Sequence, residues 1–148
     1  MHNIEKVELI IVGGGPAGLS AALAAANYGV NVILVEEREF LGGQLVKQTH
    51  RFFGSEKEYA GTRGLKISNL LVEEIKENEH IKVLTSSQVL GIYKDKIVTI
   101  LTNNKMMKYF PKALILATGA SEKFLAFENN DLPGVFGAGA VQTLMNLY

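Results

Sequence analysis

Short apolar runs alternate with a helix-like segment in the first part of the chain, and this pattern is typical of a βαβ unit. Residues Val7–Val12 and Val30–Val35 are apolar and rich in β-branched side chains, so we expect two buried strands. Between them, leucine and alanine recur at helical spacing from Pro16 onwards, and Gly29 is well placed to end the helix. Two buried strands joined by a helix predict a right-handed parallel crossover.

The rest of the chain predicts a second helix followed by several strands. Residues 37–64 are polar and rich in glycine, and we expect a long irregular loop containing a short helix. The other expected elements are an amphipathic helix over Leu65–Asn78, a strand over Lys82–Leu84, short antiparallel strands over Gln88–Tyr93, Ile97–Thr102 and Lys108–Phe110, a fully buried strand over Ala113–Ala117, a loop over 118–139, and a helix or linker over Ala140–Tyr148. The predicted fold class is α/β, with a central parallel sheet and a small antiparallel β-meander.

Composition narrows the possible functions of this single predicted domain of 148 residues. Lysine plus arginine equals aspartate plus glutamate at 15 each, which argues against nucleic acid as a partner, because nucleic-acid binders usually carry a basic excess. The absence of cysteine excludes disulfides, thiolate metal sites and a dithiol redox motif in this chain. The three histidines, His2, His50 and His80, show no metal-ligand spacing, so we expect no metal site.

The uncharged stretch Leu9–Val35 is long enough to suggest a membrane span or a signal peptide. Glycines and Pro16 interrupt the stretch near its start, and the segment before it carries Glu5 and Glu8 instead of basic residues. We therefore expect buried strands and a helix here, no membrane span, and a cytoplasmic protein.

The segment Gly13–Gly18 reads Gly-Gly-Gly-Pro-Ala-Gly and contains the spacing G-x-G-x-x-G between a predicted strand and a predicted helix. In such a turn Gly13 permits the tight bend, and Gly15 lets the backbone approach a pyrophosphate. Gly18 and Ala22 let the helix pack closely on the strand. The free N–H groups at the helix N-terminus favour an anion, so the segment predicts a Rossmann-like dinucleotide site.

Glu36, at the end of the second strand, is the acidic residue that this motif requires for the ribose hydroxyls. An acid at this position favours an unphosphorylated ribose, although Arg38 lies nearby. A P-loop would need a lysine directly after Gly18, where this chain has Leu19. The alternative interpretation is a glycine-rich turn that binds nothing, with Glu36 as a solvated strand end.

The same residues resemble a known group of proteins. The run VGGGPAGLSAA with a downstream glutamate resembles the FAD-binding half of the two-dinucleotide-domain flavoproteins, which include thioredoxin reductase. Gly42–Leu45 (GGQL) and Ala117–Gly119 (ATG) are similar to two further motifs of that group. Residues 117–146 resemble the FAD/NAD-type subunit of amine-oxidising enzymes: sarcosine oxidase, hydrogen cyanide synthase, opine oxidase and dye-linked proline dehydrogenase.

The resemblance implies FAD as the cofactor of an oxidoreductase component, in which the flavin accepts a hydride equivalent from a reduced carbon–nitrogen bond or from a nicotinamide. It implies that the backbone of Val89 lies beside the adenine, and it assigns no catalytic acid or base. The implied FAD contacts are Gly13, Gly15, Pro16, Ala17, Gly18, Glu36, Glu37, Gly43, Gln44, Val89, Thr118 and Gly119.

Two motifs of the resembled group are missing from residues 1–148. The segment Gly137–Gln142 only approximates the glycine turn of the family's NAD-type domain, and no Gly-Asp dipeptide represents the second FAD segment. The resemblance therefore implies an FAD-binding domain without these parts, as a fragment, a split subunit or a truncated form. A non-catalytic subunit that binds FAD, NAD or ADP, or that serves in assembly, is the alternative. In either case Leu144, Met145, Leu147 and Tyr148 form an apolar end that a partner subunit or a second copy would cover.

The segment Lys47–Phe53 mixes cations, amides and aromatic residues and allows two interpretations. It could place His50 or Arg51 near the flavin or at a partner surface. We favour a surface loop anchored by two buried side chains, Phe52 and Phe53, because the histidine has no evident partner in the sequence.

Overall fold

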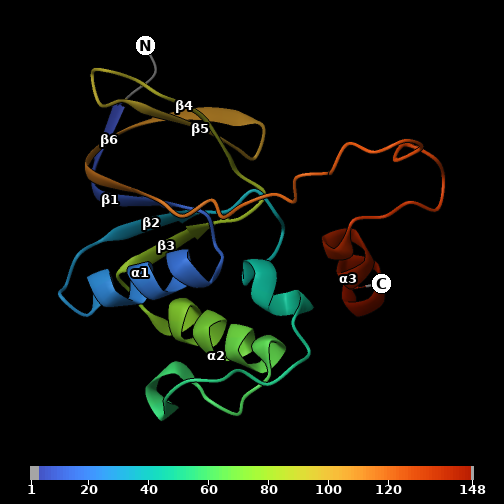
Figure 1. The fold of residues 1–148 in the computed structure, drawn as a ribbon. Helices are drawn as coiled ribbons and strands as arrows, with labels where there is room; N and C mark the ends of the chain where they lie inside the picture. The colour runs from blue at the N-terminus through green and yellow to red at the C-terminus, as the bar shows by residue number, and fades with distance from the viewer. Residues whose placement is uncertain (1–3, 148) are drawn as a thin grey trace.

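The computed structural model describes residues 4–147 and builds them around one six-stranded sheet (Figure 1). The strand order is β3-β2-β1-β6-β5-β4. The strands are β1 (Ile4–Val12), β2 (Val32–Val35), β3 (Ile81–Leu84), β4 (Gln88–Ile92), β5 (Val98–Thr102) and β6 (Lys105–Leu116). Pairs β3-β2, β2-β1 and β1-β6 are parallel, whereas β6-β5 and β5-β4 are antiparallel. The predicted α/β class, with a parallel sheet and a β-meander, is confirmed.

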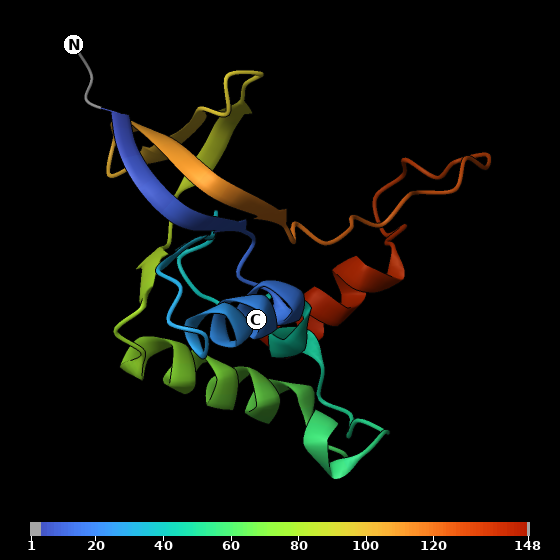
Figure 2. The same ribbon diagram turned by 90° about the vertical axis from the view of Figure 1, so that its left-hand side faces the viewer.

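Two helices, α1 (Pro16–Ala26) and α2 (Gly64–Glu77), lie on the same face of the parallel strands (Figures 1 and 2). Pro16 stands at the start of α1, where its missing N–H costs no helical hydrogen bond. The long loop after β2 contains two short 3-10 helices, η1 (Gly43–Lys47) and η2 (Glu56–Glu58). Both predicted helices are thus present, with boundaries within one residue for α2.

The alternating side chains of β1 and β2 separate the core into two layers. On one face, Leu9, Ile11 and Leu34 pack with residues of α1 and α2. On the other face, Ile10 and Ile33 pack with Val98, Ile100 and Tyr109 of the meander. Because both faces of the parallel strands are covered, these strands are apolar throughout, as their sequences indicate.

Strand β6 corrects two of the expectations from sequence. The predicted strands Lys108–Phe110 and Ala113–Ala117 are one strand, because pairing with β1 runs from Lys108 to Leu116 straight through Pro111. Pairing with β5 ends at Tyr109, so Pro111 lies where β6 has a free edge and its missing N–H is tolerated. The second half is not fully buried, since Leu116 is 62% exposed at that edge.

The last helix, α3 (Ala138–Leu147), follows a segment without regular structure and packs near η1 (Figure 1). The Asn146 side-chain amide donates to the carbonyl oxygen of Lys47 at 2.6 Å, and the Glu122 carboxylate accepts the Gly139 N–H. The expected helix or linker is therefore a helix. Leu144 and Met145 are exposed on it, while Tyr148 of the predicted apolar end lies outside the described residues.

The helices within residues 4–147 are all too short or too polar to span a bilayer.

A polar cluster ties four strands together at the end of the sheet where β2 and β3 begin. The Glu8 carboxylate accepts the backbone and side-chain N–H groups of Asn31 at 3.1 and 3.0 Å. It also accepts a hydrogen bond from the ammonium group of Lys112 on β6 at 3.0 Å. The ring of His80 contacts the Asn31 side chain at 3.2 Å. These bonds hold the pKa of Glu8 down, from 4.5 to about 2, with the backbone bond from Asn31 as the largest cause.

Replacing Glu8 with glutamine should lower stability near neutral pH and remove part of its pH dependence. A carboxylate whose pKa is depressed on folding stabilises the protein above its unfolded value of 4.5, and this stabilisation is lost as the pH falls towards about 2. The difference between wild type and Glu8→Gln in urea midpoint should therefore shrink over that range. Glu5→Gln, on the same strand, is the control and should leave the profile unchanged. A Glu8→Gln difference that stays constant with pH would contradict this role.

Candidate functional site

The parallel strands end side by side at one edge of the sheet, and two adjacent cavities lie there, as expected for an α/β fold. The first cavity, of about 320 Å³, lies beside the N-terminus of α1, and the second, of about 530 Å³, extends towards the start of β4. Four residues line both cavities: Gly13, Glu36, Glu37 and Thr118. A ligand that occupied both cavities would pass over these four residues.

The glycine turn is wedged between the end of β6 and the start of α1. Gly13 adopts a left-handed conformation (φ +108°), and its N–H donates to Val35 at 2.8 Å. A Cβ on Gly13 would overlap the Ala117 carbonyl oxygen, and one on Gly18 would overlap the Gly13 carbonyl oxygen. Neither position accepts a side chain, so these two glycines are required for the bend itself.

Gly15 differs from the other glycines of the turn. Its backbone is extended (φ −79°, ψ −176°), as expected before a proline, and this conformation is open to any residue. A Cβ here would meet only Gly43 Cα, at 3.8 Å. Gly15 and Gly43 both line the first cavity, so a side chain at position 15 would occupy space beside it. The first N–H groups of α1 have no partner within the helix and carry partial positive charge. The arrangement therefore suits a phosphate held against bare backbone.

Glu36 is joined directly to the glycine turn. Its side chain is buried, and Oε2 accepts the N–H of Gly14 at 2.6 Å while Oε1 accepts the N–H of Arg38 at 2.9 Å. Each carboxylate oxygen keeps a second lone pair that can accept a ribose hydroxyl. The acid and the turn, 22 residues apart in sequence, are thus held at hydrogen-bond distance and can act on one ligand.

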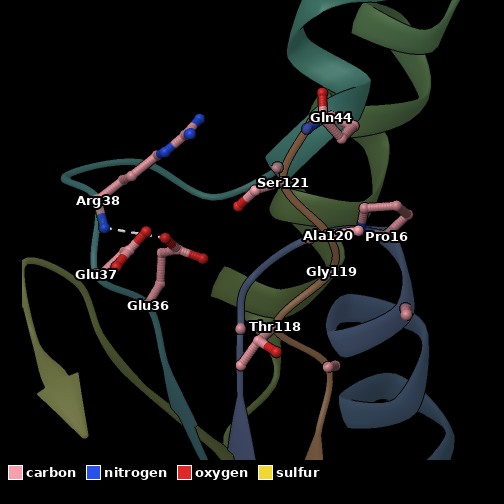
Figure 3. A pocket seen from close by; sticks show the side chains of 14 residues that line it. Pro16, Glu36, Glu37, Arg38, Gln44, Thr118, Gly119, Ala120 and Ser121 are labelled. Atoms are coloured by element: carbon pink, nitrogen blue, oxygen red, sulfur yellow. Dashed lines mark hydrogen bonds between the residues drawn. The ribbon is translucent and has the colours of Figure 1, made fainter. Parts of the chain in front are cut away.

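The Gly42–Leu45 motif lies against the glycine turn and lines the first cavity through Gly43 and Gln44. The N–H of Gly42 donates to the Gly14 carbonyl at 2.8 Å, and a Cβ on Gly43 would stand 2.7 Å from Gly15 Cα. Gln44 follows at the start of η1 and directs its side chain to the cavity (Figure 3). The backbone of this motif therefore approaches the turn as closely as glycine allows.

The structure brings almost all of the predicted cofactor residues together. The residues on the first cavity are Gly13, Gly15, Pro16, Ala17, Glu36, Glu37, Gly43, Gln44, Thr118 and Gly119. Val89 lines the second cavity. Gly18 lines neither cavity; it lies behind the turn and supports it through packing.

Several lining residues have no counterpart among the predicted ones. Arg38 and Ser121 line the first cavity, and Ser87, Gln88 and Leu90 line the second. Arg38 lies two residues after Glu36, and Ser121 lies two residues after Gly119. Their closeness to these motifs in the sequence is the one feature that indicates a place at the site. Whether their side chains face the site depends on the path of the loops, which periodicity does not predict.

The His50 loop departs from the sequence expectation in one respect. Phe52 is partly buried against the core layer that includes α1 and α2, and the His50 ring stacks on it with centroids 5.1 Å apart. Phe53, expected to be buried, is 93% exposed. The loop is thus anchored by one phenylalanine, Phe52. Neither His50 nor Arg51 lines either of the two cavities.

Comparison with known proteins gives consistent matches. The profile of a family described as pyridine nucleotide-disulphide oxidoreductase matches residues 7–146. Sarcosine oxidase subunit alpha of Corynebacterium sp. (strain P-1) is 31% identical over 99% of this chain and 16% of its own length. Hydrogen cyanide synthase subunit HcnB of Pseudomonas protegens is 33% identical over 90% of this chain and 29% of its own. The crystal structure of L-proline dehydrogenase from P. horikoshii superposes with a TM-score of 0.84 and 33% identity, covering 100% of this chain and 30% of that one. The chain thus spans less than a third of the length of these relatives. The matches confirm the predicted resemblance.

Gly18→Ala should destabilise the domain, whereas Gly15→Ala should not. The added methyl at position 18 overlaps the Gly13 carbonyl in a packed turn, and overpacking of this kind costs about 3 kcal/mol. At position 15 the same methyl meets only an ordinary contact. Chemical denaturation of the two variants, without added nucleotide, measures the difference. Equal free energies of unfolding would contradict the proposed packing of Gly18.

Proposed function

Because the chain belongs to the pyridine nucleotide-disulphide oxidoreductase family, whose members are FAD-dependent oxidoreductases, we propose that it holds the adenosine diphosphate half of FAD in the two adjoining cavities. The observation that carries this proposal is the hydrogen bond between Glu36 and the N–H of Gly14. It holds a ribose-binding acid beside a phosphate-binding turn, at the junction of the two cavities.

Each part of the nucleotide has residues suited to it. The diphosphate lies against Gly15 and the first N–H groups of α1, where no side chain intervenes. The ribose hydroxyls donate to the remaining lone pairs of Glu36. The adenine lies along the backbone of Val89 in the second cavity. This orientation places the rest of the cofactor in the part of the first cavity that the second does not share, beside Gly43, Gln44 and Gly119.

FAD, when bound, supplies the redox chemistry by accepting a hydride equivalent, and we propose as its source an amine or amino acid, or a reduced nicotinamide. The proposed amine substrate is supported by the names of the relatives, which include a sarcosine oxidase and a proline dehydrogenase. The contribution of this chain is binding and orientation. The proposal assigns no catalytic acid or base.

The proposed unit, residues 1–148, is one FAD-binding domain that acts together with further polypeptide. Two relatives are by name subunits, which supports action together with other polypeptide. The exposed apolar side chains of α3, including Leu144 and Met145, favour burial by a partner subunit or by a second copy. They also favour the second candidate function, a nucleotide-binding or assembly subunit that is not itself catalytic. A cytoplasmic location stays a prediction.

The flavin content of the purified protein tests the proposal. We expect near-stoichiometric FAD after reconstitution, measured by absorbance and by release of the cofactor on denaturation. A protein that binds ADP or NAD but no FAD would support the second candidate instead. A folded protein that binds none of these nucleotides would overturn the proposal and the nucleotide-binding form of the second candidate.

Gly15→Val should abolish nucleotide binding without unfolding the domain. The extended backbone of Gly15 accepts valine, but the side chain occupies the space of the diphosphate. We expect the affinity for FAD and for ADP to fall by about 100-fold or more. Titration calorimetry measures binding, and circular dichroism confirms the fold. A folded Gly15→Val protein that retains FAD would rule out this placement of the diphosphate.

Glu36→Ala should reduce both stability and FAD retention. The substitution leaves the N–H groups of Gly14 and Arg38 without their acceptor, a loss of about 2 kcal/mol for buried donors, and removes the ribose contact. Glu39→Ala, in the same loop but outside both cavities, is the control and should change neither property. Thermal unfolding without ligand and flavin content after gel filtration measure the two effects. Unchanged flavin content would argue against the ribose role.

A further inference from the structure

We propose that Arg38 binds the diphosphate. Its guanidinium contacts the phosphates from the side of the cavity facing away from α1, and the hydroxyl of Ser121 contacts them from the other side. The proposal rests on the proposed function, because it concerns how the same site holds the phosphates. It adds a charged contact that the glycine turn and Glu36 do not provide.

The division of the site into two cavities places Arg38 at the phosphates and not at the adenine. Arg38 lines the cavity that contains Gly15, Pro16 and Ala17, at the N-terminus of α1. It does not line the second cavity, where Val89 lies. Figure 3 shows the Arg38 side chain on one side of the first cavity, with Pro16, Gln44 and Ser121 on the other. A diphosphate beside Gly15 would therefore lie between the helix N-terminus and the guanidinium.

The charges around the cavity favour a cation beside a bound diphosphate. Glu36 and Glu37 both line it, and their carboxylates repel a diphosphate. The N-terminus of α1 offers only about half a positive charge against them. Arg38 is the one full positive charge in the cavity lining, and it forms no ion pair within residues 4–147. Its planar fork of donors suits two phosphate oxygens at once.

The backbone holds the Arg38 loop in place without help from the side chain. The N–H of Arg38 donates to Glu36 at 2.9 Å, and its carbonyl accepts the N–H of Ser86 at 2.9 Å. The neighbouring bond from the Ser87 N–H to the Glu36 carbonyl fixes the same loop to the start of the meander. The guanidinium is thus available for a ligand, and its replacement leaves these bonds intact.

Ser121 approaches from a different part of the chain. It follows the end of β6 and Gly119, whose left-handed backbone (φ +72°) redirects the segment over the cavity. In Figure 3 the Ser121 hydroxyl faces the side on which Arg38 lies. Among the described residues it has no hydrogen-bond partner of its own, so it is free to donate to a phosphate oxygen.

Affinity for nucleotides with and without phosphates tests the proposal. Arg38→Gln should weaken binding of ADP and of FAD by about tenfold, the lower range for a charged hydrogen bond, and leave binding of adenosine unchanged. The salt dependence of ADP binding should also become shallower, because one phosphate contact is lost. Arg38→Lys should retain part of the affinity as a point charge, and Ser121→Ala should cost about threefold. Lys66→Gln, which removes one exposed positive charge from α2 outside both cavities, is the matched control.

The outcomes separate this inference from the proposed function. If wild-type protein binds neither FAD nor ADP, the proposed function fails. If wild type binds both and Arg38→Gln binds ADP with unchanged affinity, only the role of Arg38 is overturned. An equal loss for adenosine and ADP would overturn it too, because it would indicate a structural effect. A tenfold loss confined to phosphate-bearing ligands, absent from Lys66→Gln, supports it.

Discussion

The hydrogen bond between the Glu36 carboxylate and the N–H of Gly14 is the interaction on which the rest of the site depends. It joins the end of β2 to the glycine turn after β1, two points that the chain separates with the whole of α1. A charged acceptor and a buried amide make this a strong hydrogen bond. Since the other carboxylate oxygen accepts the N–H of Arg38, one side chain sets the relative positions of the turn, the acid and the following loop.

Around this bond, glycine allows three backbone segments to approach each other without intervening side chains. Gly13 lies against Ala117 at the end of β6, Gly18 lies against Gly13, and Gly43 lies against Gly15. A single Cβ on Gly13, Gly18 or Gly43 would break the corresponding contact. The glycine motifs of the sequence therefore mark the places where these backbone segments touch. The sheet determines the geometry of the site, because parallel pairing places the carboxyl ends of β1, β2 and β6 side by side.

The two ends of the sheet have different physical characters. Where β2 and β3 begin, Glu8, Asn31, His80 and Lys112 satisfy one another and hold the strands together. Where the parallel strands finish, the first N–H groups of α1 and the Arg38 guanidinium are left without partners of opposite charge in the described chain. The capacity to bind a polyanion is therefore found at the second end.

Much of this protein follows from the sequence alone, because the responsible patterns are local. Apolar runs specify β1 and β2, the glycine spacing specifies the turn, and Glu36 follows at the distance that the βαβ unit requires. Only the tertiary structure decided the features that depend on contacts between distant segments. Pro111 does not interrupt β6, because the pairing of β6 with β5 stops at Tyr109. Phe53 is exposed, because Phe52 alone reaches the core. Arg38 and Ser121 line the same cavity because β2 and β6 have their carboxyl ends at the same end of the sheet. No periodicity in the sequence predicts this arrangement.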